Sequence, residues 1–180
     1  IAADNSLYLS YIDYLSYVNS VDNCATMLTC INSADGSFAF PVTCVSNQIF
    51  HKEAVKILIS NDKALVLWYD FTNGNFVVRG QLVNLAGTVL LEPEGRTFQY
   101  KRSGTVLNYK AVDLPLGSCY VYDLKNLYGR MKLYCQICDD NLSFLLGEDG
   151  IELNPDSNDE ELLKAIIKTP ENQVGILYLS

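Results

Sequence analysis

The most constraining feature of this 180-residue chain is a pair of apolar runs joined by an Asn-Gly turn. The first run, ALVLWYDF, occupies residues 64–71, and the second, FVVRGQLV, occupies residues 76–83. Both are rich in β-branched and aromatic side chains, and the type I′ turn that suits a two-residue loop needs positive φ at both central positions, which Asn and Gly tolerate. The pattern predicts a β-hairpin.

Further short apolar runs follow this hairpin at regular intervals. They read TVLL, TFQY, TVLNYKAV, SCYVY and MKLYCQI, and turn-forming residues separate them at 93–95, 103–104 and 113–117. Most of the gaps leave no room for a helix. The spacing therefore predicts a mainly β protein whose core, residues 61–138, is an antiparallel meander closed into a β-barrel or a sandwich.

Two flanking segments are expected to carry helices. Residues 1–60 read as an N-terminal extension with a helix over 6–18, where apolar residues recur at helical spacing, followed by short strands; a strand over 6–18 is the alternative. Residues 139–180 read as an acidic hairpin, a helix near 157–168 and a final strand VGILYL, packed on the core. No internal repeat is recognised.

Charge is unevenly distributed along the chain. The formal net charge is −8, which argues against a protein that coats nucleic acid. Residues 96–132 nevertheless contain seven basic and two acidic residues, whereas residues 139–161 contain nine acidic residues and no basic one. The second half of the expected barrel is therefore locally basic.

The cysteine usage and hydropathy favour a soluble protein of a reducing compartment. Six cysteines include one CxxC at 135–138, with no second pair at zinc-finger spacing, so we expect reduced thiols, no metal and no cofactor. No signal peptide and no apolar run long enough to span a bilayer is present. The chain is expected in the cytoplasm, and Ile1 in place of Met suggests a product cut from a longer precursor.

Catalytic motifs are weak. The only histidine is His51, and Gly117-Ser118-Cys119-Tyr120 resembles the GxCG nucleophile turn of viral 3C-like cysteine proteases, but Tyr120 replaces the second glycine of the oxyanion loop. We therefore expect no enzyme, with a diverged 3C-like protease as an alternative.

A different family resemblance covers residues 62–133. The segments 62–65 (DKAL), 73–77 (NGNFV), 112–117 (VDLPLG), 120–122 (YVY) and 129–131 (GRM) resemble, at similar spacing, the opening strands, the last strand and the start of the C-terminal helix of coronavirus non-structural protein nine. The resemblance implies a small RNA-binding replicase subunit of nidovirus type, located in the host cytoplasm. Gly129 is followed four residues later by Leu133, so the family's GxxxG dimer helix is incomplete.

The sequence thus predicts a binding module that contacts single-stranded RNA weakly, or partner proteins of a replicase or a host, with a homodimer possible. In the RNA hypothesis, aromatic side chains stack on bases and basic side chains follow phosphates. The expected RNA-binding residues are Trp68, Arg96, Tyr100, Lys101, Arg102 and Lys110. The alternative is a protein-interaction or host-interaction module that binds no RNA.

Overall fold

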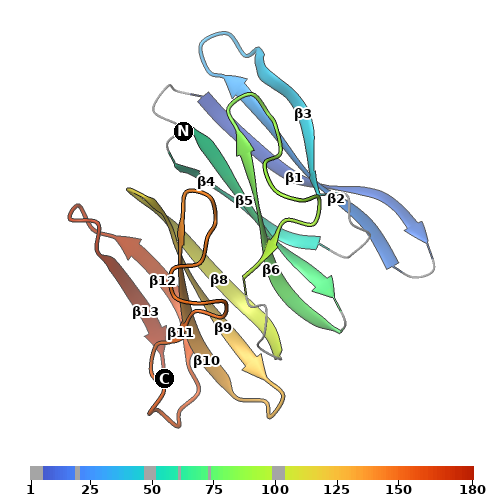
Figure 1. The fold of residues 1–180 in the computed structure, drawn as a ribbon. Coiled ribbons are helices and arrows are strands. Elements are labelled where there is room, and N and C mark those ends of the chain that lie inside the picture. The colour runs from blue at the N-terminus through green and yellow to red at the C-terminus, as the bar shows by residue number, and fades with distance from the viewer. Residues whose placement is uncertain (1–5, 19–20, 47–51, 61, 73, 99–103) are drawn as a thin grey trace. The chain divides into compact units, whose positions relative to one another are not determined.

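The structure, a computed structural model, describes residues 6–18, 21–46, 52–60, 62–72, 74–98 and 104–180 (Figure 1). Within these ranges the protein is built from antiparallel strands and contains no helix, so the mainly β prediction is confirmed. The described strands form open sheets, so the closed barrel that was one of the two expected architectures is not formed in this part of the chain. The strands are β1 (Ser6–Val18), β2 (Val21–Asn32), β3 (Phe38–Ser46), β4 (Lys52–Ser60), β5 (Lys63–Thr72), β6 (Asn75–Asn84), β7 (Arg96–Thr97), β8 (Gly104–Leu114), β9 (Gly117–Asn126), β10 (Met131–Asp139), β11 (Ile151–Glu152), β12 (Leu162–Lys168) and β13 (Val174–Leu179).

The chain divides into two compact units. The first comprises residues 1–72 and 79–97, and the second comprises residues 73–78 and 98–180. This division does not follow the segments expected from the sequence, because the expected core of residues 61–138 contributes strands to both units.

The first unit is a sandwich of two antiparallel sheets, ordered β1–β2–β3 and β4–β5–β6–β7 (Figure 1). Its core is shared by both sheets and comprises Leu28, Cys30, Phe40, Val45, Ala64, Val66, Trp68 and Val83. In β5, the five residues from Ala64 to Trp68 are all buried, which explains a continuous apolar run in an antiparallel strand. The predicted hairpin around the Asn-Gly turn is confirmed, since β5 and β6 are neighbours and Gly74 has φ +80°.

The second unit packs the hairpin β12–β13 against one face of the sheet β11–β10–β9–β8. Leu163 of β12 joins the core cluster with Cys119, Val121, Leu133 and Cys135 of the sheet. On the other face of β9, the rings of Tyr120 and Tyr122 stack with centroids 5.2 Å apart, and other aromatic rings extend the cluster. The tyrosine-rich composition therefore fills one face of this sheet.

The two predicted helices are wrong, and both segments are strands. In β1, exposed and half-buried side chains alternate from Ser6 to Asp13, which is the period of a strand. Residues 162–168 pair with β13 in a hairpin, where β-branched Ile166 and Ile167 suit a sheet better than a helix. The acidic residues before β12 form a loop rather than a first helical turn, because the buried Glu161 carboxylate accepts the backbone N–H of Leu133.

The loop that follows β6 is anchored by side-chain amides. The Oε1 atom of Gln81 accepts the backbone N–H groups of Leu82 and Leu91. In the tight turn that follows β6, Asn84 Oδ1 accepts the backbone N–H groups of Ala86 and Thr88. The loop closes at Gly95, which has φ +65°, a conformation that glycine adopts readily. A Cβ at this position would also overlap the carbonyl oxygen of Gly80 on β6.

The same loop occurs a second time after β10, with each anchoring residue 55 positions later. Gln136 Oε1 accepts the N–H groups of Ile137 and Leu146, Asp139 replaces the asparagine, and Gly150 closes the loop at φ +67°. The segments QLVNLAGTVLLEPEG and QICDDNLSFLLGEDG also share their first residue, the LL pair and the last glycine. The chain therefore contains an internal structural repeat, which corrects the expectation that it has none.

Candidate binding surfaces

The structure describes three of the six residues expected to bind RNA. Trp68 is fully buried in the core of the first unit, so its ring has no free face for a base, which corrects its expected role. Arg96 is exposed on β7 of the first unit, whereas Lys110 is half-buried on β8 of the second unit. The remaining three lie outside the described residues: Tyr100, Lys101 and Arg102.

Two basic residues of the second unit serve its own structure. Lys132 is buried and its Nζ donates a hydrogen bond to the backbone carbonyl of Ser157. Lys110 lies close enough to Asp123 to lower the pKa of that carboxyl, although burial is the larger effect and raises it overall. These cations therefore balance buried or polar groups instead of lining a common exposed face.

A basic and aromatic turn joins β9 to β10, and none of its residues was among those expected to bind RNA. Asn126 Oδ1 accepts the backbone N–H groups of Tyr128 and Arg130 at 2.9 and 3.0 Å, which fixes the turn. The turn presents Leu127, 76% exposed, and Tyr128, 91% exposed, between the exposed side chains of Lys125 and Arg130. A rigid turn with an aromatic ring between two cations is suited to an anionic ligand with flat rings.

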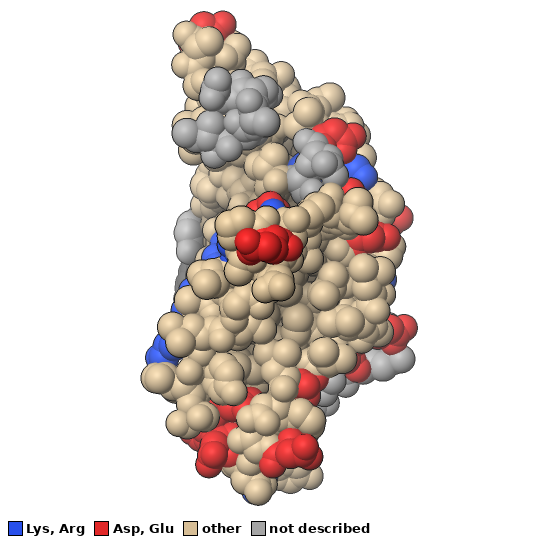
Figure 2. Space-filling model, turned by 90° about the vertical axis from the view of Figure 1, so that its left-hand side faces the viewer, with Lys and Arg blue, Asp and Glu red and all other residues tan. Residues whose placement is uncertain are grey.

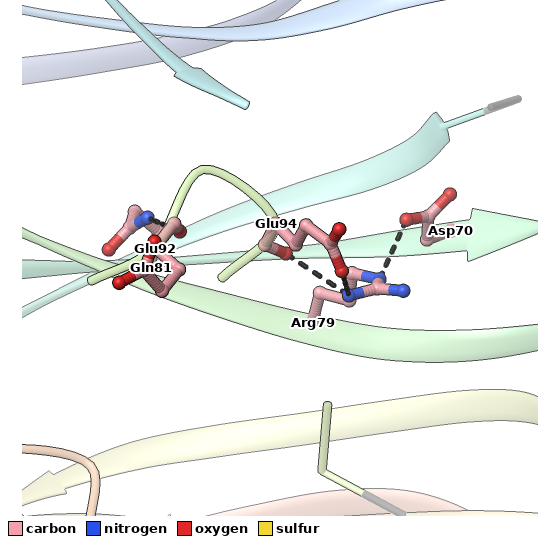
Figure 3. Close-up of polar contacts among 5 residues, drawn as sticks. All are labelled: Asp70, Arg79, Gln81, Glu92 and Glu94. Atoms are coloured by element: carbon pink, nitrogen blue, oxygen red, sulfur yellow. Dashed lines mark hydrogen bonds and ion pairs between the residues drawn. The ribbon is translucent and has the colours of Figure 1, made fainter. Parts of the chain in front are cut away.

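A buried ion pair links β5 to β6 (Figure 3). Arg79 Nε lies 2.8 Å from Asp70 Oδ2, and Arg79 Nη1 reaches the backbone carbonyl of Glu94 at 3.2 Å. Beside it, Gln81 Nε2 donates to the backbone carbonyl of Glu92 at 2.9 Å. Burial raises the pKa of Asp70, and the charges of Arg79 and Lys52 oppose that rise. These groups are engaged with one another and with the loop, so the cluster is a structural clamp.

Two cysteines meet in the core of the second unit. Cys119 Sγ and Cys135 Sγ are 3.7 Å apart, and both side chains are buried. The hydrogen bond between the two sulfurs and their burial raise the pKa of the Cys119 thiol, which keeps it neutral and unreactive. Among the residues with described placement, no group of three or more His, Cys, Asp or Glu could hold a metal ion. His51 lies outside those residues.

The outer face of the β1–β2–β3 sheet is an apolar surface. The pairing register aligns Leu7, Ile31 and Phe38 in one row across the three strands, and Tyr11 lies opposite Met27 in another. Four large side chains of this face are 41–63% exposed: Leu7, Leu9, Tyr11 and Phe38. A sheet face of this composition is normally covered. We call it the outer apolar face.

The segment that forms the outer apolar face carries only acidic charges in its sequence. Residues 1–51 contain four aspartates and no Glu, Lys or Arg. Asp13 on β1 and Asp35 in the β2–β3 turn are exposed. Asp35 Oδ1 accepts the hydroxyl and backbone N–H of Ser37, which lowers the pKa of Asp35 and keeps the carboxylate charged.

A second apolar surface lies on the β12–β13 hairpin. Ile167, Leu177 and Leu179 are 55–63% exposed, and β13 contains no charged residue. Figure 2 looks onto the left-hand side of Figure 1, where β13 lies, and uncharged side chains predominate over that part of the surface.

Comparisons with protein-family models, curated proteins and solved structures found no match. The resemblance to coronavirus non-structural protein nine and a replicase origin therefore stay predictions. The helix that this resemblance implies after residue 125 is not formed, because the described chain turns there and continues as β10. No helix in the described residues is long and apolar enough to cross a membrane.

Proposed function

We propose that this chain is a non-enzymatic module that binds a partner protein through the outer apolar face. The observation that carries the proposal is that Leu7, Leu9 and Tyr11 of β1 are well exposed on one face of the sheet. Phe38 of β3, which is also well exposed, lies in the same cross-strand row as Leu7. At about 25 cal/mol per Å² of apolar area, covering such a face provides a driving force for association.

The partner is a different protein with an apolar patch bordered by Lys or Arg. Exposed Asp13 and Asp35 accompany the face, and no basic residue occurs before Lys52. Two copies meeting through this face would bring their acidic borders together, each on a chain of net charge −8, whereas a basic border would be attracted.

The experiment compares matched charge insertions on the two apolar surfaces. A protein retained by the immobilised chain is purified and titrated by calorimetry against wild type, Leu9→Glu with Phe38→Glu, and the control Leu177→Glu. We expect the double variant to bind at least ~30-fold more weakly, since central interface residues are worth about 2 kcal/mol or more, and the control to bind normally.

Asp13→Lys with Asp35→Lys should also weaken binding and reduce its salt dependence. Unchanged affinity in the Leu9 and Phe38 double variant, or loss of binding only in Leu177→Glu, would refute the assignment of the face. Circular dichroism of each variant checks that the strands remain.

A second candidate function is weak binding of single-stranded RNA at the β9–β10 turn. The observation in its favour is the exposed ring of Tyr128 between the exposed side chains of Lys125 and Arg130. In this hypothesis the ring stacks on one base, and the two cations contact one phosphate each. Fluorescence anisotropy of a labelled oligouridine should then show a log–log salt slope of about −1.4, at ~0.7 for each phosphate.

Lys125→Glu with Arg130→Glu should abolish this RNA binding, and Tyr128→Ala should weaken it. The sequence analysis instead placed phosphate contacts at Lys101 and Arg102, so Lys101→Glu with Arg102→Glu is measured beside the Lys125 and Arg130 reversals to decide which pair contacts RNA. Absence of binding at low salt would eliminate both versions.

A further inference from the structure

Strand β13 is paired along one edge only. It forms a two-stranded antiparallel sheet with β12, and among the described residues no strand lies along its other edge (Figure 1). The free edge of a β-strand presents a row of backbone N–H and C=O groups that can pair with the strand of another chain. Proteins normally protect such an edge with a charged residue, a proline or a β-bulge, or by keeping the strand very short.

The other outermost strands of the described sheets all have such protection. The strands β7 and β11 are two residues long, β3 contains Pro41, and β1, β4, β8 and β12 each contain at least one charged residue. In contrast, β13 has six residues, VGILYL, with no charge and no proline. The register shift of its hairpin lies on β12, so β13 itself is regular. It is therefore the edge best suited to pairing.

The first unit shows which strand is lacking beside β13. In each unit a four-stranded sheet is covered by a second sheet, whose first strand lies beside β4 in the first unit (β1) and beside β8 in the second (β12). The strand β13 thus occupies the position of β2, which is paired on both sides, with β1 and with β3. The described part of the second unit has no strand in the position of β3.

We propose that a second copy of this chain supplies the lacking strand, and that the two β13 strands pair antiparallel about a two-fold axis perpendicular to their sheet. The contact joins two β12–β13 hairpins into one four-stranded sheet. It covers both free edges at once, because each copy offers the edge that the other needs. A strand from a different protein would cover only one of them.

The side chains of the hairpin suit a symmetric contact. Val174 and Ile176 pack toward the core of the second unit, whereas Leu177 and Leu179 are 63% and 55% exposed on the opposite face. Residues 162–179 contain two lysines and one glutamate, a net charge of +1, although the whole chain carries −8. Because β13 has no charge of its own, symmetric pairing opposes no like charges across the two strands.

The test measures self-association of the full chain by sedimentation equilibrium, from about 1 μM to about 1 mM. We expect a weak dimer, half formed near 100 μM as an order of magnitude, because one six-residue strand per copy is a small interface. Leu177→Lys should weaken the dimer at least about tenfold. The control Leu85→Lys should not, since Leu85 is an exposed leucine of the first unit whose equivalent in the repeat is Asp140.

A charge-complementation experiment tests the symmetry. In the registers of largest overlap, residue 177 of one copy lies opposite or diagonal to residue 177 of the other. A mixture of Leu177→Lys and Leu177→Glu should therefore associate about fivefold more tightly than either variant alone. Circular dichroism checks the fold of each variant, and Leu179→Lys replaces Leu177→Lys in the dilution test if the latter does not fold.

Two further measurements separate this edge from other surfaces. The Leu9→Glu with Phe38→Glu variant should dimerise like wild type, because the outer apolar face is not part of the contact. In a dimer of labelled and unlabelled chains, isotope-filtered NMR should show contacts between the two β13 strands.

A chain that stays monomeric at about 1 mM, or a dimer that Leu177→Lys leaves unchanged, would refute the proposal. Intermolecular contacts from β13 to any other strand would refute the symmetric pairing.

Discussion

Replacing Arg79 with methionine should destabilise the first unit by about 3 kcal/mol. Asp70 is completely buried and its main cation is Arg79, with Nε 2.8 Å from Oδ2. Removing one partner of a buried pair typically costs about 3–5 kcal/mol, because an uncompensated charge remains. We expect the lower end of this range, since Lys52 also attracts Asp70 and is retained.

The deficit of Arg79→Met should shrink as the pH falls. Burial raises the pKa of Asp70, so the folded state takes up a proton at a higher pH than the unfolded state, whose carboxyl titrates near 3.9. Lowering the pH through that interval therefore stabilises the folded state. Without the Arg79 charge the pKa rises further, so the variant gains more than wild type between pH 7 and pH 4.

The assay is urea denaturation at pH 7, 5 and 4, followed by tryptophan fluorescence. Trp68 is the only tryptophan and lies in the core of the first unit, so its emission reports that unit. Glu94→Gln is the control in the same unit, because the Glu94 carboxylate is 61% exposed and lies 3.8 Å from Arg79 Nη1, so this ion pair should contribute less than about 1 kcal/mol. A deficit below about 1 kcal/mol in Arg79→Met, or one that is equal at all three pH values, would refute the reasoning.

Three further predictions concern the second unit and its turns. Gly150→Ala should lower the free energy of unfolding clearly more than Gly36→Ala in urea melts. Both glycines have positive φ, which costs alanine about 1–2 kcal/mol, but only at Gly150 would an added Cβ overlap the carbonyl of Cys135. Leu163→Ala should cost about 2–5 kcal/mol by thermal melting, because its side chain joins β12 to the sheet core. Deleting residues 155–180 should abolish the near-ultraviolet dichroism of the tyrosine cluster, and a truncated chain that keeps this signal would contradict the role of the β12–β13 hairpin.

The strands of this fold were more predictable from sequence than its layers. The Asn-Gly hairpin is fixed by local turn chemistry, so it could be located within a residue. The segments 6–18 and 157–168 were wrongly predicted as helices, because short apolar runs fit both helical and strand periods until a pairing strand is known. Tyr11 and Leu9 are exposed while Tyr8 packs on the core, and that distinction depends on which face of β1 meets the second sheet.

Site residues were less predictable than strands. Trp68 was expected to contact RNA bases, because aromatic side chains on the solvent-facing side of a sheet can stack on them. The structure buries consecutive residues of β5, so neither face of this strand is exposed at Trp68. The repeat was missed because only a few side chains are constrained by the loop geometry, and Gln81 and Gln136 are recognisable as equivalents only through the N–H groups that they accept.

The repeated turn also shows how one space is filled from two different directions. In the first unit Gly87 has φ +81°, and an added Cβ would collide with the ring of Phe40, which comes from β3. The equivalent residue of the second unit is Leu142, buried, with φ +59°, in a unit whose second layer has two strands instead of three. The second turn therefore buries a side chain of its own at this position, at the expense of backbone strain, whereas the glycine of the first turn lies against a ring from a neighbouring strand. Loss of β3 would leave a hole beside Gly87, while the turn at Leu142 needs no such donor.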